Sequence, residues 1–173
     1  MVCSANLRYG MYHQDLRRTY LSGHSFSSKC DGEVLPLLYQ KCGIRFIEKI
    51  KGMFSICIID KSKSEIYLIR DRFGIKPLFI YQDKDKTVVG SEAGSIAKLL
   101  NLKVDTQSIL EWKLLRSTTP QFTYFKKLHQ FPKSCYKTDQ SEFIPYYNGF
   151  KGTIEKQNEK FLIKGCYDHI TNK

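Results

Sequence analysis

The densest group of residues that could do chemistry follows a buried apolar segment near the middle of the chain. There Arg70 and Asp71 end a predicted strand, Gly74 follows three residues later, and Pro77 opens the next apolar run. Glycine reaches backbone angles that are barred to other residues, and proline forces the residue before it to be extended. A loop of this kind can hold a polar network at the edge of a pocket. A hairpin corner without any chemistry is the alternative that these residues leave open.

A second candidate, Asp31, lies further back, at the start of a run with helical spacing. Apolar residues recur between Val34 and Tyr39, and Gly43 ends the run. Aspartate is a favoured N-cap residue, because its carboxylate accepts hydrogen bonds from the free backbone amides at a helix start. The position therefore predicts an N-cap, and it leaves open a second role for Asp31 in holding a ligand.

The elements that must position these residues can be predicted from hydrophobic periodicity. A helical period appears before and after a set of apolar, β-rich runs, of which the first two form a hairpin buried on both faces. This order predicts an α+β domain with helices packed on sheets. The predicted helices cover 12–21, 31–43, 44–50, 91–100 and 107–115, and the predicted strands cover 53–60, 65–71, 77–81 and 87–90, with an irregular hairpin over 131–144.

Length and composition set the scale of the fold. The chain has 173 residues, of which 42% are hydrophobic, and this fits one domain at roughly 100–200 residues per domain. Residues 1–150 are predicted to form that domain, and the polar, Lys-rich stretch 151–173 is predicted to be a linker with a weak terminal helix. No apolar run reaches the roughly 18 residues that a membrane-spanning helix needs, so no membrane contact is expected.

Charge and cysteine content argue against several kinds of site. The net charge is +11, but the basic residues are spread along the whole chain, which favours a Lys-rich surface over a nucleic-acid interface. The six cysteines form neither a CxxC pair nor a Cys/His cluster with zinc spacing, so we predict no metal site and no cofactor in this chain. Free thiols in a cytoplasmic protein are expected, because a chain with this core does not need disulfides.

Four ordered pieces of the sequence stand out: RDRFGIKPLF at 70–79, CDGEVL at 30–35, GSEA at 90–93, and a late hairpin with FKKL at 125–128 and PKSCY at 132–136. In order and spacing these pieces resemble class II glutamine amidotransferases, and the domain of asparagine synthetases is the most similar. Four pieces in the family's order are a stronger signal than any one short motif. The resemblance covers roughly residues 12–147.

The resemblance implies a four-layer αββα sandwich of the N-terminal-nucleophile type, present only in part. In the family an N-terminal Cys attacks the side-chain amide of glutamine, and its own α-amino group acts as the base. An Asn-Gly pair stabilises the oxyanion. The ammonia then passes to a synthetase domain that uses ATP and Mg to convert aspartate to asparagine. The implied partners are therefore glutamine and a synthetase domain or subunit.

The sequence departs from the family pattern at the nucleophile. It begins Met-Val-Cys, so Cys3 does not become terminal when the Met is removed, and a core thiol is expected. Asn6 is the counterpart of the oxyanion Asn, but Leu7 and Arg8 follow it in place of Gly and Glu. No residue is therefore assigned a catalytic role, and the domain is expected to be truncated and inactive alone.

The family pattern assigns the binding residues one by one. Asp31 matches the residue that holds the α-amino group of glutamine, so Asp31 and Asn6 are the predicted substrate-binding residues. Arg70, Asp71 and Gly74 form the predicted pocket loop.

Two functions stay open at this point. The chain is either part of a glutamine-dependent asparagine synthetase that needs further segments, or a non-catalytic binding or regulatory module derived from an amidotransferase domain. The synthetase domain and its phosphate loop are expected to be missing. Because the family has further strands upstream, the strand over 53–59 is expected to keep an open edge and apolar faces, which predicts poor solubility.

Overall fold

The computed structural model describes residues 2–8, 13–116 and 122–149, and for residues 2–8, 13 and 31 it describes the backbone alone. Helices and antiparallel sheets make up the described fold, so the α+β prediction is confirmed. The predicted linker over 151–173 lies outside the described residues, and so do Met1 and the segments 9–12 and 117–121.

Within the described residues, four strands lie between two groups of helices, as predicted, while one strand precedes the first helix and three follow the last. The helices are α1 (His13–Thr19), the 3-10 helix η1 (Asp31–Glu33), α2 (Val34–Cys42), the 3-10 helix η2 (Gly43–Glu48), α3 (Ala93–Leu100) and α4 (Thr106–Leu115). The strands are β1 (Val2–Arg8), β2 (Met53–Asp60), β3 (Glu65–Arg70), β4 (Phe79–Gln82), β5 (Thr87–Gly90), β6 (Leu128–Gln130), β7 (Cys135–Thr138) and β8 (Ile144–Pro145).

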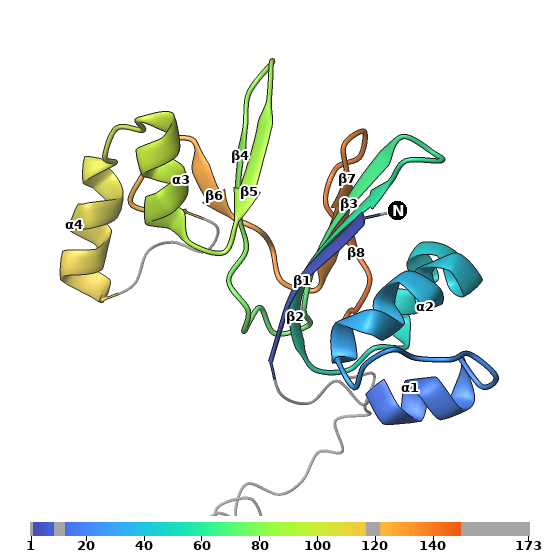
Figure 1. Ribbon diagram of the computed structural model, residues 1–173. Helices are drawn as coiled ribbons and strands as arrows, with labels where there is room; N and C mark the ends of the chain where they lie inside the picture. Colours follow the sequence, from blue (N-terminus) through green and yellow to red (C-terminus); the bar gives the residue numbers. More distant parts are fainter. Residues whose placement is uncertain (1, 9–12, 117–121, 150–173) are drawn as a thin grey trace, which may run out of the picture.

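The strands form two antiparallel sheets (Figure 1). Sheet A has the order β1-β2-β3-β7-β8, and sheet B has the order β5-β4-β6. The predicted hairpins β2–β3 and β7–β8 are present, and the predicted strands β4 and β5 also pair as a hairpin. Strand β1 pairs with β2 along its whole length, from Val2 opposite Ile59 to Arg8 opposite Met53. The open edge predicted for the strand over 53–59 is therefore wrong, because β2 lies between β1 and β3.

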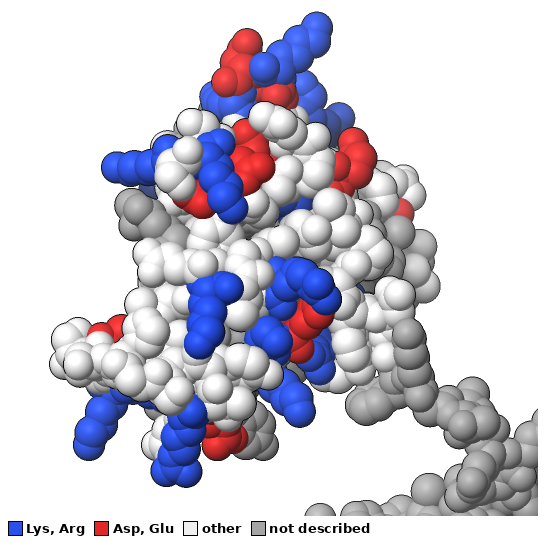
Figure 2. Space-filling view, turned by 90° about the vertical axis from the view of Figure 1, so that its right-hand side faces the viewer, with Lys and Arg blue, Asp and Glu red and all other residues white. Residues whose placement is uncertain are grey.

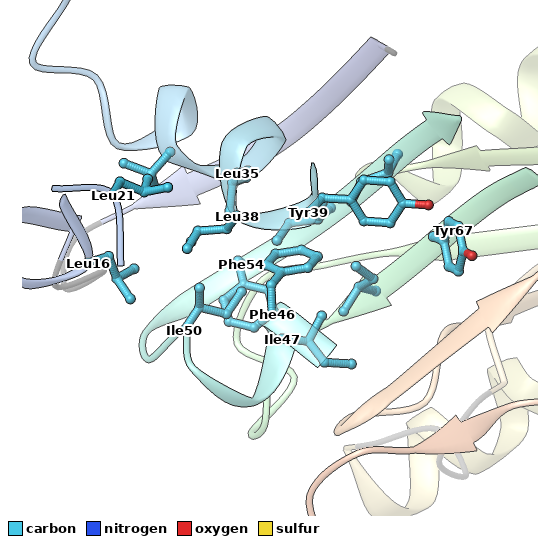
Figure 3. Packing of buried hydrophobic residues seen from close by; sticks show 14 residues of the cluster. Leu16, Leu21, Leu35, Leu38, Tyr39, Phe46, Ile47, Ile50, Phe54 and Tyr67 are labelled. Carbon is cyan, nitrogen blue, oxygen red and sulfur yellow. The ribbon is translucent and has the colours of Figure 1, made fainter. Parts of the chain in front are cut away.

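The main core fills the space between sheet A and the helices α1, α2 and η2 (Figure 3). Successive side chains of a strand point to opposite faces, and this alternation places Phe54, Ile56 and Ile58 of β2 on the helical side. Helix α2 contributes its apolar stripe, including Leu35 and Leu38, which are both fully buried. This cluster holds the strands that carry the predicted site in fixed register.

Two smaller clusters connect the remaining elements. One joins the two sheets, because Leu68 of β3 packs with Ile80 of β4 and with Phe131. The other lies between sheet B and α3, where Tyr81 packs with Ile96. Helices α1 and α2 thus cover sheet A, while α3 and α4 lie beyond sheet B on the other side of the molecule (Figure 1).

The helix starts differ from the sequence-based prediction. Asp31 is the first residue of η1 and is not an N-cap, because Cys30 occupies the N-cap position of η1 and Glu33 that of α2. The short helix predicted over 44–50 is the 3-10 helix η2. It is separate from α2 because Gly43 adopts a φ of 59° and stops the α-helical hydrogen bonding.

The surface carries its positive charge in separate places. On the face drawn in Figure 2, lysine and arginine side chains project from several points, and acidic side chains lie among them. This distribution agrees with the interpretation of a Lys-rich surface. Within the described ranges, no helix is both long enough and apolar enough to cross a membrane.

Candidate functional site

The predicted pocket loop connects β3 of sheet A to β4 of sheet B and is built around Asp71. The residue is fully buried. Its Oδ1 accepts hydrogen bonds from the backbone amides of Phe73 (3.0 Å) and Ile75 (3.1 Å), and its Oδ2 accepts one from the amide of Lys76 (2.9 Å). Bonds to an ionised acceptor are stronger than neutral ones. One side chain therefore fixes the backbone of the whole turn.

Arg70 holds the same loop through its carbonyl groups. Its Nε donates to the carbonyl of Lys76 (2.9 Å) and its Nη2 to that of Gly74 (2.6 Å), while Nη1 donates to the carbonyl of Phe131. Burial lowers the pKa of the Arg70 guanidinium from its ordinary value, and the charge of Asp71 opposes that shift. An arginine keeps its charge in proteins. Arg70 is thus a buried cation that donates three hydrogen bonds to backbone carbonyls.

Gly74 is required at its position by conformation and by space. Its φ of +68° is one that other residues rarely adopt. A Cβ on Gly74 would lie 3.1 Å from the Cβ of Lys133 and 3.2 Å from the Cζ of Arg70. The glycine therefore lets the loop approach both the arginine and the segment after β6.

Residues at the two ends of the β7–β8 hairpin donate hydrogen bonds to the backbone of the pocket loop. Ser134 donates from its Oγ to the carbonyl of Arg72 (2.7 Å), and its amide donates to the carbonyl of Asp71 (3.0 Å). The hydroxyl of Tyr146 donates to the carbonyl of Arg70 (2.8 Å), and burial raises the pKa of that tyrosine. The piece around 132–136 that resembled the family thus contacts the signature loop.

A cavity of about 520 Å³ lies on the open side of the loop. Arg70 and Gly74 line it, together with Phe73 and residues 130–133. Asp71 does not line the cavity, because it is buried beneath the turn. Arg70 and Gly74 therefore form part of the cavity wall, and Asp71 fixes the backbone of the loop from the buried side.

The structure brings the two predicted substrate-binding residues to neighbouring elements. Asn6 lies within β1. It stands opposite Ser55 of β2, which stands opposite Arg70 of β3. Neighbouring strands are about 4.8 Å apart, so the backbone of Asn6 lies roughly 10 Å from that of Arg70 across the sheet. The 3-10 helix η1, which carries Asp31, contacts β1.

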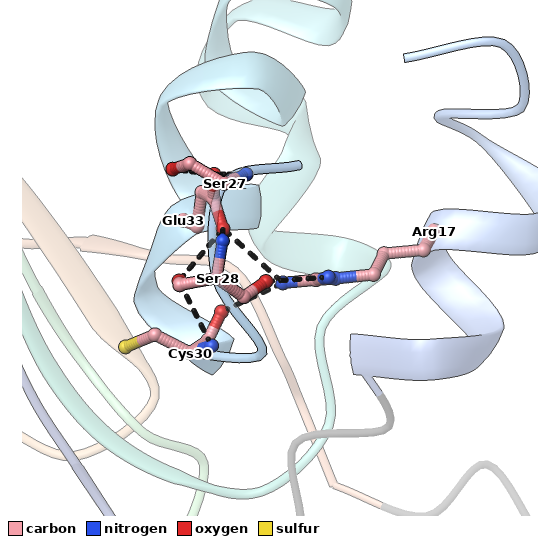
Figure 4. A network of polar contacts seen from close by, with 5 residues as sticks. All are labelled: Arg17, Ser27, Ser28, Cys30 and Glu33. Atoms are coloured by element: carbon pink, nitrogen blue, oxygen red, sulfur yellow. Dashed lines mark hydrogen bonds and ion pairs between the residues drawn. The ribbon is translucent and has the colours of Figure 1, made fainter. Parts of the chain in front are cut away.

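Sequence reasoning missed a polar network that precedes Asp31 (Figure 4). Glu33 accepts four hydrogen bonds, from the amide and the hydroxyl of Ser27 and of Ser28. Arg17 of α1 donates to the carbonyls of Ser28 and Cys30, at 2.9 Å each. The CDGEVL piece contained Glu33, but its partners were not evident, and nothing in the spacing linked Arg17 to it.

Comparison with known proteins decides the family. The sequence profile described as "Glutamine amidotransferase domain" matches residues 10–147. The chain belongs to this family. The match contains all four pieces on which the resemblance rests, and both Asp31 and the loop of Arg70 lie inside it.

Relatives of this amidotransferase domain are asparagine synthetases. Asparagine synthetase (glutamine-hydrolyzing) 2 of Bacillus subtilis is 43% identical over 86 residues, which are 50% of this chain and 12% of that protein. Asparagine synthetase B (glutamine-hydrolyzing) of Escherichia coli is 36% identical over 81 residues, 46% of this chain and 15% of that protein. Asparagine synthetase (glutamine-hydrolyzing) of Sandersonia aurantiaca is 36% identical over 76 residues, which are 44% of this chain and 14% of that protein. The predicted resemblance is confirmed, over a small part of each relative.

Proposed function

We propose that this chain is the glutamine-binding domain of a glutamine-dependent asparagine synthetase system. The observation that carries the proposal is the family match over 10–147. It is supported by the signature loop, in which Arg70 and Asp71 use their charged groups to fix one backbone conformation. A preorganised loop of this kind suits the wall of a binding site, because ligand binding then costs little conformational entropy.

The roles of the binding residues follow from the family pattern. Asp31 holds the α-ammonium group of glutamine, and Asn6 donates to the side-chain carbonyl oxygen. The support is that η1 contacts β1, so the two residues come from adjacent elements. The loop of Arg70 and Gly74 forms a further wall, in line with Asn6 across sheet A.

We do not assign glutamine hydrolysis by the family mechanism to this chain. That mechanism needs a cysteine whose own α-amino group is free, and Cys3 lies inside β1, paired with Ile58. Among the described side chains, those of Cys30, Cys42, Cys57 and Cys135 form no disulfide. Burial raises the pKa of the thiols of Cys57 and Cys135, which disfavours the reactive thiolate. We therefore assign binding without turnover to the chain alone.

The finer fold is proposed as part of a four-layer αββα sandwich of the N-terminal-nucleophile type. Its support is the order of the three apolar clusters, which lie between the first helices and sheet A, between the two sheets, and between sheet B and α3. Asn6 of the edge strand β1 and Arg70 at the end of β3 lie in one row across sheet A of this sandwich.

Asparagine synthesis itself requires a partner. The relatives are much longer than the matched segment, and the printed sequence contains no Ser-Gly-Gly phosphate loop. ATP and Mg are therefore assigned to a synthetase domain or subunit and to no residue of this chain, and a cytoplasmic location is part of the same proposal.

Calorimetric titration of the purified chain with L-glutamine tests the proposal, together with an assay for released ammonia. The wild-type chain should bind glutamine and release no ammonia above the buffer rate. Asp31→Asn should abolish measurable binding, whereas Asp85→Asn, at an exposed turn, should leave it unchanged. A wild-type chain that binds no glutamine, or one that hydrolyses it, would contradict this function.

A further inference from the structure

The turn before α2 is held by an unusually dense set of charged contacts. Both oxygens of the Glu33 carboxylate accept two hydrogen bonds each: Oε1 from the amide and hydroxyl of Ser27 (2.7 Å each), and Oε2 from the amide (3.0 Å) and hydroxyl (2.8 Å) of Ser28. These four donors lower the pKa of Glu33 to about 2. The carboxylate is therefore charged at neutral pH.

Arg17 closes the same turn from α1. Its Nη1 donates to the carbonyl of Ser28 and its Nη2 to that of Cys30, and Nη2 also lies 3.5 Å from Oε2 of Glu33. The guanidinium stacks over the ring of Phe26, 4.0 Å from its centroid. The side chains of Arg17 and Glu33 are only 17% and 23% exposed, so the pair is shielded on the protein surface.

The contacts hold the backbone that leads into Asp31. The carbonyl of Cys30, directly before Asp31, is held by Arg17, and the carboxylate of Glu33, two residues after Asp31, holds the amides of Ser27 and Ser28. Figure 4 shows these five residues gathered where η1 leads into α2. The backbone before Asp31 is thus fixed by charge-assisted hydrogen bonds, which are the strong kind.

We infer that Arg17 and Glu33 are positioning residues for glutamine selection, which fix the turn over 27–33 so that Asp31 meets the α-ammonium group of the ligand. The inference rests on the proposed function, since it takes the role of Asp31 from there. Arg17 and Glu33 themselves do not touch the ligand. They act through the placement of Asp31, and binding geometry is sensitive to such placement at the level of about 1 Å.

The test compares L-glutamine with 4-carbamoylbutanoate, which is glutamine without its α-amino group. The variants are Glu33→Gln and Arg17→Lys, with Glu48→Gln and Arg18→Lys as controls at exposed neighbouring positions. Dissociation constants come from calorimetry. Amide hydrogen exchange at Ser27 and Ser28 reports the turn without any ligand, because both amides donate to Glu33.

Wild-type protein should bind glutamine more tightly than the analogue. Glu33→Gln should weaken glutamine binding by about tenfold and leave the analogue unchanged, because a misplaced Asp31 affects only the ammonium contact. Arg17→Lys should act in the same direction, because lysine cannot reach two carbonyls with one planar fork. Exchange at the two serine amides should accelerate in Glu33→Gln and stay at the wild-type rate in both controls.

Each other outcome has a distinct meaning. Equal weakening of glutamine and analogue, or unchanged affinities with accelerated exchange, would show that the network supports the fold without positioning Asp31, and would overturn the inference. Unchanged exchange in Glu33→Gln would show that the turn does not depend on the network, which also overturns it. If the wild-type chain binds neither ligand, the proposed function fails first, and accelerated exchange would then identify a purely structural network.

Discussion

The helices on the two sides of the sheets are packed to very different degrees. Helix α2 buries Val34, Leu35, Leu38 and Tyr39 against sheet A. In α4, by contrast, the only buried residue is Ser108. Three of its leucines stay largely exposed: Leu110 at 53%, Leu114 at 82% and Leu115 at 72%.

The difference shows which part of the described fold stands on its own. Fourteen buried apolar residues form the cluster beneath α1 and α2, whereas three form the cluster beneath α3. An isolated helix shorter than about 12–15 residues is marginal in water, and tertiary packing normally supplies its stability. Sheet A with its helices should therefore be the stable unit, and α4 should open locally at a much lower free energy.

The largest expected effect separates the two regions directly. Phe54→Ala, in the main core, should lower the free energy of unfolding by about 3–5 kcal/mol, because it removes a fully buried ring and leaves a cavity. The matched change Leu114→Ala in α4 should stay within about 0.5 kcal/mol. Urea denaturation followed by circular dichroism measures both. Similar losses for the two variants would mean that α4 is packed as firmly as α2.

The loop that connects the two sheets should show the next largest effect. Asp71→Asn should cost about 2–3 kcal/mol, because the amide that replaces the carboxylate cannot accept all three backbone hydrogen bonds and leaves a buried donor unpaired. The same denaturation experiment applies, with Asp85→Asn as the exposed control. A neutral result for Asp71→Asn would show that the loop does not couple the sheets.

A smaller effect is expected at the glycine of this loop. Gly74→Ala should cost about 1–2 kcal/mol from its left-handed conformation alone, and more from the contacts at 3.1 and 3.2 Å. Gly23 is a useful control, since its φ is +90° and nothing lies within 4 Å of an added Cβ. The melting temperature should therefore fall further for Gly74→Ala than for Gly23→Ala. Equal decreases in melting temperature would indicate that backbone strain alone matters and that the contacts of the added Cβ with Lys133 and Arg70 do not.

The smallest expected effect compares the two glutamates at the starts of α2 and α3. Hydrogen bonds lower the pKa of both carboxyl groups below the ordinary value of 4.5. Ser27 and Ser28 donate to Glu33 and lower its pKa to about 2. Ser95 and Gly94 donate to Glu92 and lower its pKa in the same direction. A lowered folded-state pKa means that the stabilisation is complete above pH 4.5 and is lost as pH falls toward the folded value.

The melting temperatures of Glu33→Gln and Glu92→Gln should therefore lie below that of the wild type at pH 7. The gap should close between pH 4.5 and about pH 2 for Glu33, the range set by its pKa. Thermal melts at several pH values measure it. A gap for Glu33→Gln that is independent of pH would show that its charge does not stabilise the turn.

The sequence predicted the strands far better than the turn that carries Asp31. The strands over 53–60 and 87–90 coincide with β2 and β5, because alternating or continuous β-branched residues leave few alternatives. The strand predicted from 77 begins at Phe79, because Pro77 lacks the amide that a ladder needs. Strand β1 was not recognised as a full strand, since its partner β2 lies more than forty residues away in the sequence.

The candidate site was predictable only in part. The residues of the loop, Gly74 and Pro77 among them, predicted a tight turn, and the positive φ of Gly74 agrees with this prediction. The way Asp71 binds three amides could not be predicted, because it depends on the exact path of the turn. Arg17 and Glu33 meet only after the chain folds back, so no local pattern connects them.

The central claim is that glutamine binds where η1, β1 and the loop of Arg70 come together. The most direct measurement is an amide chemical-shift map of the 15N-labelled chain titrated with L-glutamine. We predict that shifts gather around Asn6, Asp31 and the loop over 70–76, and that they are absent from α4. No shifts at saturating glutamine, or shifts gathered at another surface, would contradict the account.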